Sequence, residues 1–191
     1  MNTAPLNEAS KLVSLAAAGD VTAQRHLVER LQRRVQSISL SILGNALDAE
    51  DTTQAILIEI LQSAGSFRGH SLLGWADRIA VRTAIRHARQ RRVRAMQCEV
   101  REDVEQYPES YDRALYEQAI PRSIMEYLSL LPETRRVAVV LRHVMGYSIE
   151  EIAELTEVSP NTVKDRLLHA RNQLRRLIRR DQVLLGKGRP E

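Results

Sequence analysis

Residues 148–180 read SIEEIAELTEVSPNTVKDRLLHARNQLRRLIRR, and this stretch decides the fold of the C-terminal part of the chain. Ser148 can cap a helix, and Glu151, three residues later, completes a capping box. The helical pattern breaks at residues 158–160, where Ser159 is a good N-cap and Pro160 suits the first position of a second helix. A short capped helix, a turn and a longer helix predict a helix-turn-helix.

The second of these helices carries charges of almost one sign. Its apolar positions recur every three or four residues, at Val163, Leu167, Ala170, Leu174 and Leu177. Against the single acid Asp165 stand seven basic residues: Lys164, Arg166, Arg171, Arg175, Arg176, Arg179 and Arg180. Such a helix could also be a solvated bundle face, a membrane-surface helix or a partner-binding helix. Because its apolar stripe is narrow and lacks aromatic residues, and ordinary surface helices mix both signs of charge, we expect it to bind DNA.

Apolar periodicity predicts three helices in the N-terminal half. The first is capped by Asp20, ends at residues 44–45 and keeps one apolar face, formed by Leu27, Leu31, Val35, Ile38 and Ile42. The second begins at Asp48 and ends at residues 64–65. The third begins near Leu72 and directs inward the side chains of Trp75, Ile79, Ala80, Thr83 and Ala84. The opposite face of this third helix carries Arg78, Arg82, Arg86 and Arg89.

Two more helices are expected before the helix-turn-helix. The first has an apolar face made by Ile124, Leu128 and Leu131. Pro132 suits the first turn of the next helix and Gly146 ends it, with four residues inside: Val137, Val140, Leu141 and Val144. The chain holds six Pro, eight Gly and few β-branched runs, so it is expected to be mostly helical.

Charge is distributed in blocks along the chain. Residues 78–94 hold seven arginines and no acid, whereas residues 99–117 hold seven acids and two arginines. Apolar periodicity fades in the acidic block, which we interpret as a linker that is flexible or only locally helical. The expected fold class is all-α: two small helical domains at 1–95 and 119–182, an acidic linker at 96–118 and a tail at 183–191. In a chain of 191 residues each domain can bury an adequate core.

The sequence lacks the residues that several classes of function require. Cys98 is the only cysteine and the five histidines have no metal-ligand spacing, so we expect no disulfide, no metal site and no other cofactor. The sequence has no Gly-rich phosphate loop and no nucleophile beside a base, so we expect no catalytic residue and no enzyme. It has no apolar run of membrane-spanning length and no signal peptide, which predicts a cytoplasmic protein without membrane insertion.

Short motifs follow one another in a distinctive order. They are DAED at 48–51 with Gln54, FRG at 67–69, RIA at 78–80, LPE at 131–133, GYS at 146–148, EEIA at 150–153 and TVK at 162–164. In this order, on either side of an acidic linker, they resemble the extracytoplasmic-function (ECF) branch of the bacterial sigma-70 factors. The resemblance implies region 2 in the first domain and region 4 in the second. It further implies an alternative sigma factor that recognises −10 and −35 promoter elements, aids promoter melting and is controlled by an anti-sigma factor.

The resemblance implies that the helix predicted to begin at Asp48 binds RNA polymerase core, which includes the beta and beta′ subunits. The residues concerned are Asp48, Glu50, Asp51 and Gln54. Asp51 and Gln54 are three residues apart and share a helix face, which offers a small polar target. The helix dipole alone favours carboxylates in a first turn and could explain these acids without a partner. The family pattern is richer in bulky and aromatic residues at several positions of this helix, so we expect the polymerase contact to be atypical in detail; these positions hold Thr52, Thr53, Ala55, Ile58, Ile60 and Leu61.

The loop at 66–71 and the basic helix after it are expected to take the −10 element. A protein that opens promoter DNA needs a pocket for an extruded base and cations for the flanking phosphates. By the resemblance, the residues near the −10 strand are Arg68, Gly69, His70, Ser71, Arg82, Arg86 and Arg89. We expect Arg89 to meet backbone phosphate, which adds affinity and salt dependence but little sequence preference. The expected role of the two aromatic residues here, Phe67 and Trp75, is core packing.

The helix-turn-helix is expected to take the −35 element. The residues implied are Arg142, Asn161, Thr162, Lys164, Asp165, Leu168, His169 and Arg171. The chemistry of base edges permits Lys164 to read guanine, Leu168 to meet a thymine methyl group and Asp165 to accept from cytosine N4. Arg142 is expected to meet phosphate from the preceding helix. Asp165 and His169 depart from the small hydroxyl and basic residues frequent in the family, so we expect an altered −35 preference.

Two other classes of binding protein fit parts of this pattern. A sigma-like decoy would bind an anti-sigma protein and never DNA, but both basic helix faces are retained here. An autonomous helix-turn-helix regulator would need a dimerisation helix and palindromic half-sites, and no clear dimer seam is visible in the sequence. The preferred interpretation is therefore a promoter-specificity subunit with no chemistry of its own.

Overall fold

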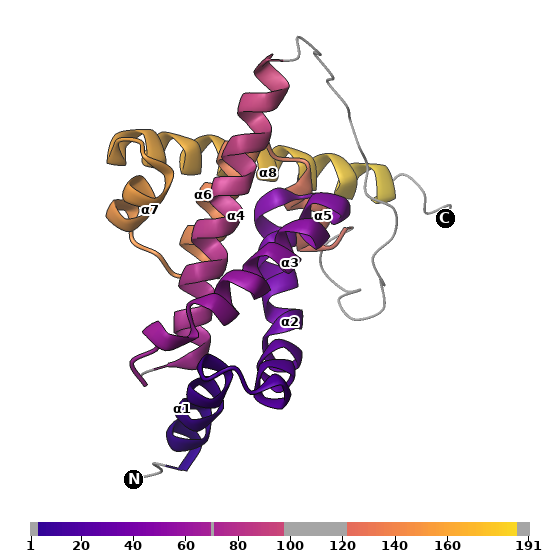
Figure 1. Cartoon of the computed structure of the whole chain (residues 1–191). Coiled ribbons are helices and arrows are strands. Elements are labelled where there is room, and N and C mark those ends of the chain that lie inside the picture. The colour runs from indigo at the N-terminus through magenta and orange to yellow at the C-terminus, as the bar shows by residue number, and fades with distance from the viewer. Residues whose placement is uncertain (1–3, 70, 98–121, 187–191) are drawn as a thin grey trace. The chain divides into compact units, whose positions relative to one another are not determined.

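The computed structural model describes residues 4–69, 71–97 and 122–186, which form two compact units at 1–93 and 94–191 (Figure 1). Every regular element in these ranges is a helix, which confirms the prediction of an all-α chain with two helical domains. None of these helices combines the length and the apolar character needed to cross a membrane. Most of the predicted acidic linker, and His70, lie outside the described residues.

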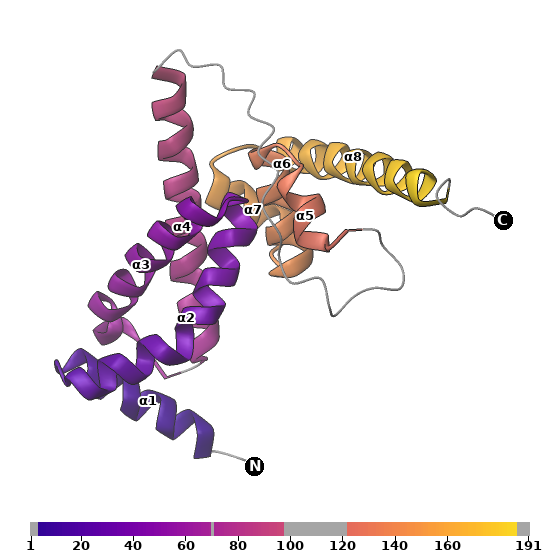
Figure 2. The same ribbon diagram turned by 90° about the vertical axis from the view of Figure 1, so that its right-hand side faces the viewer.

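The first unit contains α1 (Ala4–Ala17), α2 (Val21–Leu43), α3 (Ala46–Gln62), the 3₁₀ turn η1 (Ala64–Ser66) and α4 (Leu72–Gln97). Asp20 caps α2 as predicted, because its carboxylate accepts a hydrogen bond of 2.8 Å from the Ala23 N–H. Gly44 ends α2 with φ 75°, in the left-handed region that glycine adopts without strain. Figures 1 and 2 show α2 and α3 side by side.

The core of the first unit follows the predicted apolar faces. On α2 the buried residues include Leu27, Leu31, Val35, Ile38 and Ile42. On α4 they include Ile79, Ala80, Thr83 and Ala84. Trp75 is half-buried, and its ring centroid lies 5.4 Å from that of Phe67 with the planes tilted by 58°. This aromatic pair packs the loop before α4 against the helix, which agrees with the packing role expected for both rings.

Helix α1 is absent from the sequence-based prediction. It buries Ala9, Val13 and Ala16 and contacts α2 and η1. Two of these three side chains are single methyl groups, so the apolar periodicity that they produce is weak. Packing against its neighbours, rather than a strong local pattern, therefore accounts for this helix.

The start of α3 differs from the prediction. Asn45, and not Asp48, is the N-cap, because Asn45 Oδ1 accepts a hydrogen bond of 2.8 Å from the Asp48 N–H. Asp48 lies in the first turn, where its carboxylate accepts hydrogen bonds from Asn45 and Arg91. Asn and Asp are almost equally good N-caps, so the local sequence does not distinguish Asn45 from Asp48. The backbone geometry after Gly44 determines that Asn45 is the cap.

The second unit contains α5 (Ile124–Ser129), α6 (Glu133–Val139), the π-helical segment η2 (Val140–Val144), α7 (Ile149–Thr156) and α8 (Pro160–Gly186). The predicted capping box of Ser148 and Glu151 is present, and Ser123 and Glu126 form another at the start of α5. Ser159 Oγ accepts from the Thr162 N–H at 3.1 Å and caps α8 as predicted. The helix-turn-helix of α7 and α8 is therefore confirmed.

Two positions predicted to lie inside the second unit are exposed: the exposed fraction is 62% for Val144 and 64% for Ile124. Val144 ends the π-helical segment, in which the Met145 N–H donates to the Val140 carbonyl at 3.0 Å. A π turn is wider than an α turn and changes the direction of the residues that follow. Helix α5 has only six residues and buries Tyr127 and Leu128 instead of Ile124. Pro132 lies at the N-cap position of α6, just before its first turn.

The turn between α7 and α8 contains an unusual backbone conformation. Glu157 has φ 52° and ψ 47°, the left-handed conformation that side chains with a Cβ rarely adopt. Its N–H donates to the carbonyls of Ala153 and Glu154, which closes the last turn of α7. The helix-turn-helix geometry therefore holds this residue against its local preference.

Candidate nucleic-acid interface

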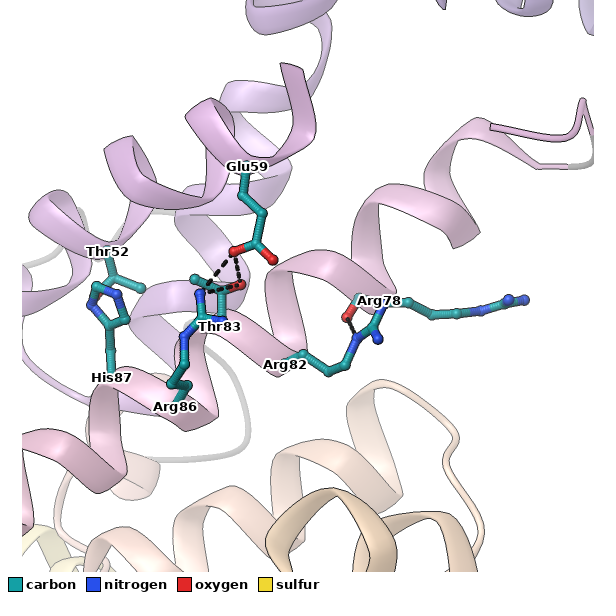
Figure 3. A network of polar contacts seen from close by, with 7 residues as sticks. All are labelled: Thr52, Glu59, Arg78, Arg82, Thr83, Arg86 and His87. Atoms are coloured by element: carbon teal, nitrogen blue, oxygen red, sulfur yellow. Dashed lines mark hydrogen bonds and ion pairs between the residues drawn. The ribbon is translucent and has the colours of Figure 1, made fainter. Parts of the chain in front are cut away.

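Polar side chains join α3 and α4 at three levels along the two helices. The pairs are Glu59 with Thr83 and Arg86, Thr52 with His87, and Asp48 with Arg91. Figure 3 shows the first two levels, with Thr83 and Arg86 at Glu59 and His87 beside Thr52. Residue numbers rise along α3 as they fall along α4, so the two helices run antiparallel. Side chains of α3 thus hold α4 along one side, and of the α4 residues involved Arg86 also belongs to the arginine face that the sequence assigns to DNA.

Two of these contacts meet at Glu59. One carboxylate oxygen, Oε2, accepts a hydrogen bond of 2.6 Å from the Thr83 hydroxyl and another of 2.9 Å from Arg86 Nη2 (Figure 3). Burial raises the pKa of Glu59, but these two hydrogen bonds and the charges of Arg86 and Arg82 lower it by more, so the pKa lies below its ordinary value. Glu59 is therefore a carboxylate at neutral pH, and it partly neutralises the arginine face of α4.

The predicted −10 residues on α4 are held in different ways. Arg82 and Arg86 lie one turn apart with exposed side chains, as the sequence predicts. Arg82 Nε donates a long hydrogen bond of 3.4 Å to the Arg78 carbonyl of its own helix, whereas Arg86 is paired with Glu59 of another helix. Arg89 follows one turn later and is half-buried.

The predicted −10 residues of the loop lie at the start of α4. Arg68 is exposed and its Nη1 donates to the Gly65 carbonyl at 3.2 Å. Gly69 has φ 79°, so a residue with a Cβ would be strained there. Ser71 Oγ accepts from the Gly74 N–H at 3.1 Å and caps α4. These residues precede Arg82 by about three helical turns, so the structure does not bring the two groups into one cluster.

The predicted polymerase-binding residues divide into two groups. Glu50, Asp51 and Gln54 are exposed on α3, as expected for a partner surface. The resemblance assigns Asp48 to the same polymerase-binding set, but its side chain is only 37% exposed and already contacts Asn45 and Arg91. The acidic target on this helix is therefore smaller than the sequence suggests.

Two apolar side chains extend this surface of α3. Leu47 is 80% exposed and Ile58 is 55% exposed, and helical spacing places them on the face of Asp51 and Gln54. Neither residue is among the predicted polymerase contacts, although the spacing of Leu47 from Asp51 and of Ile58 from Gln54 is four residues in the sequence. The face thus presents polar groups between two apolar ones.

The predicted −35 residues lie at the start of α8. Lys164, Asp165, Leu168, His169 and Arg171 are all exposed. Among the residues that the structure describes, none forms a hydrogen bond or ion pair with the side chains of Lys164, Asp165, His169 and Arg171. Asn161 is exposed, and Thr162 is half-buried with its hydroxyl 2.9 Å from Ser159 Oγ. The first turns of α8 therefore offer charged groups to a partner without first breaking an internal contact.

Arg142 has a structural contact in addition to its predicted role. Its side chain is exposed, and Nη1 donates to the Tyr147 carbonyl at 2.9 Å. This bond links η2 to the segment that leads into α7. Arg142 therefore supports the helix-turn-helix, and its other N–H groups can still reach a phosphate.

An apolar groove that the sequence did not predict lies beside the −35 residues. Its volume is about 490 Å³, and it is lined by side chains of α6, η2 and α8. The apolar ones include Val139, Leu167, Leu174 and Ile178. Basic side chains, among them His143 and Lys164, also line it. The positions on α8 follow from helical spacing, but Val139 and His143 join them only through tertiary packing.

A buried carboxylate holds the other end of α8. Asp181 is 5% exposed, and its Oδ2 lies 2.7 Å from Arg122 Nε and 3.1 Å from the Tyr127 hydroxyl. Burial, followed by the hydrogen bond to Asp181, raises the pKa of Tyr127 to about 12. This contact ties α8 to α5 and to Arg122, which precedes α5. Nothing in the sequence pattern distinguishes Asp181 from a surface acid.

Comparisons with known proteins match both units. The family model of Sigma-70 region 2 covers residues 27–94, and that of Sigma-70, region 4 covers residues 122–174. The RNA polymerase sigma-H factor of Pseudomonas aeruginosa is 30% identical over 174 residues, covering 86% of this chain and 90% of that protein. The ECF RNA polymerase sigma-E factor of Escherichia coli K12 is 32% identical over 183 residues, covering 88% and 95%.

A solved structure shows the same fold. The sigma factor RpoE from Bartonella quintana, in a complex with the anti-sigma factor NepR, matches with a TM-score of 0.59 and 23% identity. The match covers 81% of this chain and 96% of that one. Because both family regions match in order and the curated relatives align over nearly their whole length, the chain belongs to the extracytoplasmic-function branch of the sigma-70 family of RNA polymerase sigma factors.

Proposed function

We propose that this sigma factor binds RNA polymerase core, directs it to promoters with spaced −10 and −35 elements and aids melting of the −10 DNA. The observation that carries the proposal is the group of Lys164, Asp165 and His169, whose side chains are exposed at the start of a helix-turn-helix recognition helix and pair with none of the residues that the structure describes. Region 2 is proposed to occupy 1–95 and region 4 to occupy 119–182, joined by the acidic linker 96–118, with a tail at 183–191. The protein acts by binding and performs no chemistry.

Core polymerase is proposed to bind the exposed face of α3. Glu50, Asp51 and Gln54 supply polar groups, and Leu47 and Ile58 supply apolar contact area at the two ends. When a partner buries apolar side chains that are this exposed in the free protein, the burial favours binding. Asp48 contributes less, since Arg91 and Asn45 already occupy its carboxylate.

Promoter DNA is proposed to bind both basic helices. Arg68, Gly69, His70 and Ser71 are proposed to receive an extruded −10 base, and Arg82, Arg86 and Arg89 are proposed to meet the strand that follows. On the −35 element Lys164, Asp165, Leu168 and His169 approach base edges, whereas Asn161, Thr162, Arg142 and Arg171 contact the backbone. The two domains bind DNA weakly until the polymerase holds them at the right spacing.

An anti-sigma factor is proposed as a further partner, and the protein is proposed to act in the cytoplasm. RpoE, which shares this fold, was solved with such a factor, and the partner would cover the polymerase-facing surface of α3. A binding assay between this chain and candidate anti-sigma domains, with and without core polymerase, tests the competition. Simultaneous binding of both partners would contradict it.

The proposed function is tested by transcription from a promoter library with core polymerase, with and without this protein. Sequencing of the transcripts is expected to show start sites that depend on the protein and are preceded by two spaced motifs. The −35 motif should contain bases suited to Asp165 and His169. If the protein binds no core polymerase and enables no start site, the decoy or autonomous regulator interpretations take its place.

The division of labour between base and phosphate contacts is tested in the same assay. Lys164→Ala is expected to relax the preference at one position of the −35 motif, because a base contact is lost. Arg89→Ala is expected to weaken all promoters evenly, because a phosphate contact carries no sequence information. Equal losses on every promoter for both variants would refute this division.

A further inference from the structure

One arginine of the proposed −10 face is held by an acid from another helix. Arg86 of α4 donates Nη2 to Glu59 Oε2 of α3 at 2.9 Å, and the two side chains are 55% and 35% exposed (Figure 3). An ion pair at this exposure contributes little to folding stability. Its presence on a DNA-binding face therefore calls for another explanation, since an acid there repels phosphate.

Glu59 is itself anchored by a buried hydroxyl. Thr83 is 1% exposed and donates to the same Oε2 atom at 2.6 Å. The carboxylate cannot follow Arg86 outward without leaving this buried hydroxyl without its partner, which has a cost in free energy. Glu59 is therefore a fixed point on the surface of region 2 rather than a mobile counter-charge.

Arg86 keeps hydrogen-bonding capacity beyond this contact. A guanidinium carries five N–H donors, and Glu59 uses Nη2 alone. Within the described residues, Nη1 and Nε of Arg86 form no hydrogen bond. Arg86 can thus donate to a phosphate while it stays bound to Glu59, and no internal contact has to break.

Arg82, one turn earlier, provides the contrast. Its Nε reaches the Arg78 carbonyl of its own helix at 3.4 Å, a weak contact that leaves the side chain several orientations. An arginine that is already oriented loses less conformational entropy on binding than one that is not. Arg86 is therefore the better placed of the two for a contact of defined geometry.

We propose that Glu59 is a positioning residue of the −10 site: anchored by Thr83, it holds the Arg86 guanidinium in the orientation in which Arg86 binds a phosphate of the −10 strand. This inference rests on the proposed function. It assigns to Glu59 and Thr83 a role in promoter binding that acts entirely through Arg86.

A double-mutant cycle tests this dependence. The protein bound to core polymerase is titrated with a fork-junction DNA that carries the −10 strand of a promoter found in the library experiment. Glu59→Ala is expected to weaken binding about tenfold, as is Arg86→Ala, in line with one charge-assisted hydrogen bond. The double variant should bind like Arg86→Ala alone, because Glu59 has no effect without its partner.

Three further variants separate positioning from other effects. Glu59→Gln keeps an acceptor for Thr83 and Arg86 and should lose less than Glu59→Ala. Thr83→Val removes the hydroxyl that anchors Glu59 and that also accepts a long contact of 3.5 Å from Arg86 Nη2, and it should lose affinity in the protein that keeps Arg86 but not in the Arg86→Ala variant. Glu29→Gln makes the same chemical change on an exposed acid of α2 and should leave −10 binding unchanged.

Two outcomes would overturn the inference. Tighter DNA binding by Glu59→Ala would make Glu59 a competitor of phosphate, and an equal loss in the presence and absence of Arg86 would make its effect independent of Arg86. Thermal unfolding and core binding, measured on each variant, identify a loss caused by misfolding. If Glu59→Ala misfolds, the double-mutant cycle is run with Thr83→Val in its place. If the unmodified protein forms no polymerase complex, the proposed function fails, whereas additive losses in a working complex refute this inference alone.

Discussion

Helices α4 and α8 carry similar rows of arginine in the sequence, but the structure holds the two rows differently. Acids and hydroxyls of α3 contact α4, with Glu59 on Arg86 and Asp48 on Arg91. On α8 three basic side chains, Lys164, Arg171 and Arg175, form no ion pair with any part of the chain that the structure describes. The one buried acid of α8, Asp181, lies at its far end.

A basic helix can therefore bind DNA in two ways. Charges that are held in advance lose little entropy on binding but are partly neutralised, which suits a contact of defined geometry. Charges that remain in solvent keep their full attraction for phosphate and its dependence on salt. Region 2 must hold a melted strand in place, and region 4 must read a duplex whose backbone supplies much of the affinity.

The largest effect is expected at the buried acid of α8. Asp181→Ala leaves Arg122 and Tyr127 without their partner in a nearly closed site and should lower the free energy of unfolding by about 2–3 kcal/mol. Asp181→Asn keeps an acceptor and should lose less. Chemical denaturation of both variants measures the difference. If Asp181→Ala lowers the free energy of unfolding no more than Glu59→Ala does, the buried acid of α8 stabilises its unit no more than the half-exposed acid of α3 stabilises the other.

The same site predicts a dependence of stability on alkaline pH. Tyr127 has a pKa raised from 10.0 to about 12 in the folded protein, so its contribution is complete below pH 10 and is lost as the pH rises toward 12. Tyr127→Phe cannot ionise and should flatten this part of the pH profile, with an effect smaller than that of Asp181→Ala. Thermal unfolding between these pH values checks it, and identical slopes in both proteins would contradict the assignment.

Held and solvated arginines should respond differently to salt. Arg175→Ala is expected to weaken promoter binding a few-fold and to lower the slope of log affinity against log salt by about 1. Arg86→Ala should weaken binding about tenfold with a smaller change in that slope, because Glu59 already neutralises part of its charge. Titrations of the polymerase complex at several salt concentrations measure both quantities. Equal slopes for the two variants would remove the distinction between α4 and α8.

The first turn of α3 allows a matched pair of variants. Asp48→Ala removes the contacts with Asn45 and Arg91 and should lower stability by about 0.5–1 kcal/mol while retaining most of the affinity for core polymerase. Asp51→Ala should leave stability unchanged and weaken polymerase binding, because Asp51 is exposed. Thermal unfolding and a core-binding titration separate the two. A reversed result would return Asp48 to the polymerase-binding surface.

The smallest effect is expected in the turn before α8. Glu157 lies in the left-handed region with φ 52°, where glycine has no steric strain. Glu157→Gly should therefore raise the free energy of unfolding by about 0.5 kcal/mol, the difference between relieved strain and the greater freedom of glycine in the unfolded chain. Glu157→Ala keeps the Cβ and serves as the control, which should show no gain.

Much of the fold could be predicted because local chemistry and helical period agree there. The capping box of Ser148 and Glu151, the N-caps Asp20 and Ser159, and the apolar face from Leu27 to Ile42 all lie where the sequence places them. The prediction is wrong at Val144 and Ile124, where a π turn and a six-residue helix break the regular period. It misses α1, whose apolar signal is weak.

The sequence predicts which residues form the candidate site, but it does not predict which partners their side chains contact. Exposure of Lys164, Asp165 and His169 follows from the period of α8, whereas the environment of Arg86 and Asp48 depends on which residues of α3 come near them. The exposed apolar pair on α3, Leu47 and Ile58, was readable from spacing once the buried face of the helix was known.

By itself the sequence determined the all-α class, the two helical units, the helix-turn-helix and the order of motifs that places the chain among the sigma-70 factors. These features depend on caps and periodicity, which act over a few residues. Only the tertiary structure decided that Glu59 and Thr83 hold Arg86, that Arg91 occupies Asp48 and that Asp181 is buried against Tyr127. The partners in these contacts are 24 to 54 residues apart along the chain, so local pattern carries no record of them.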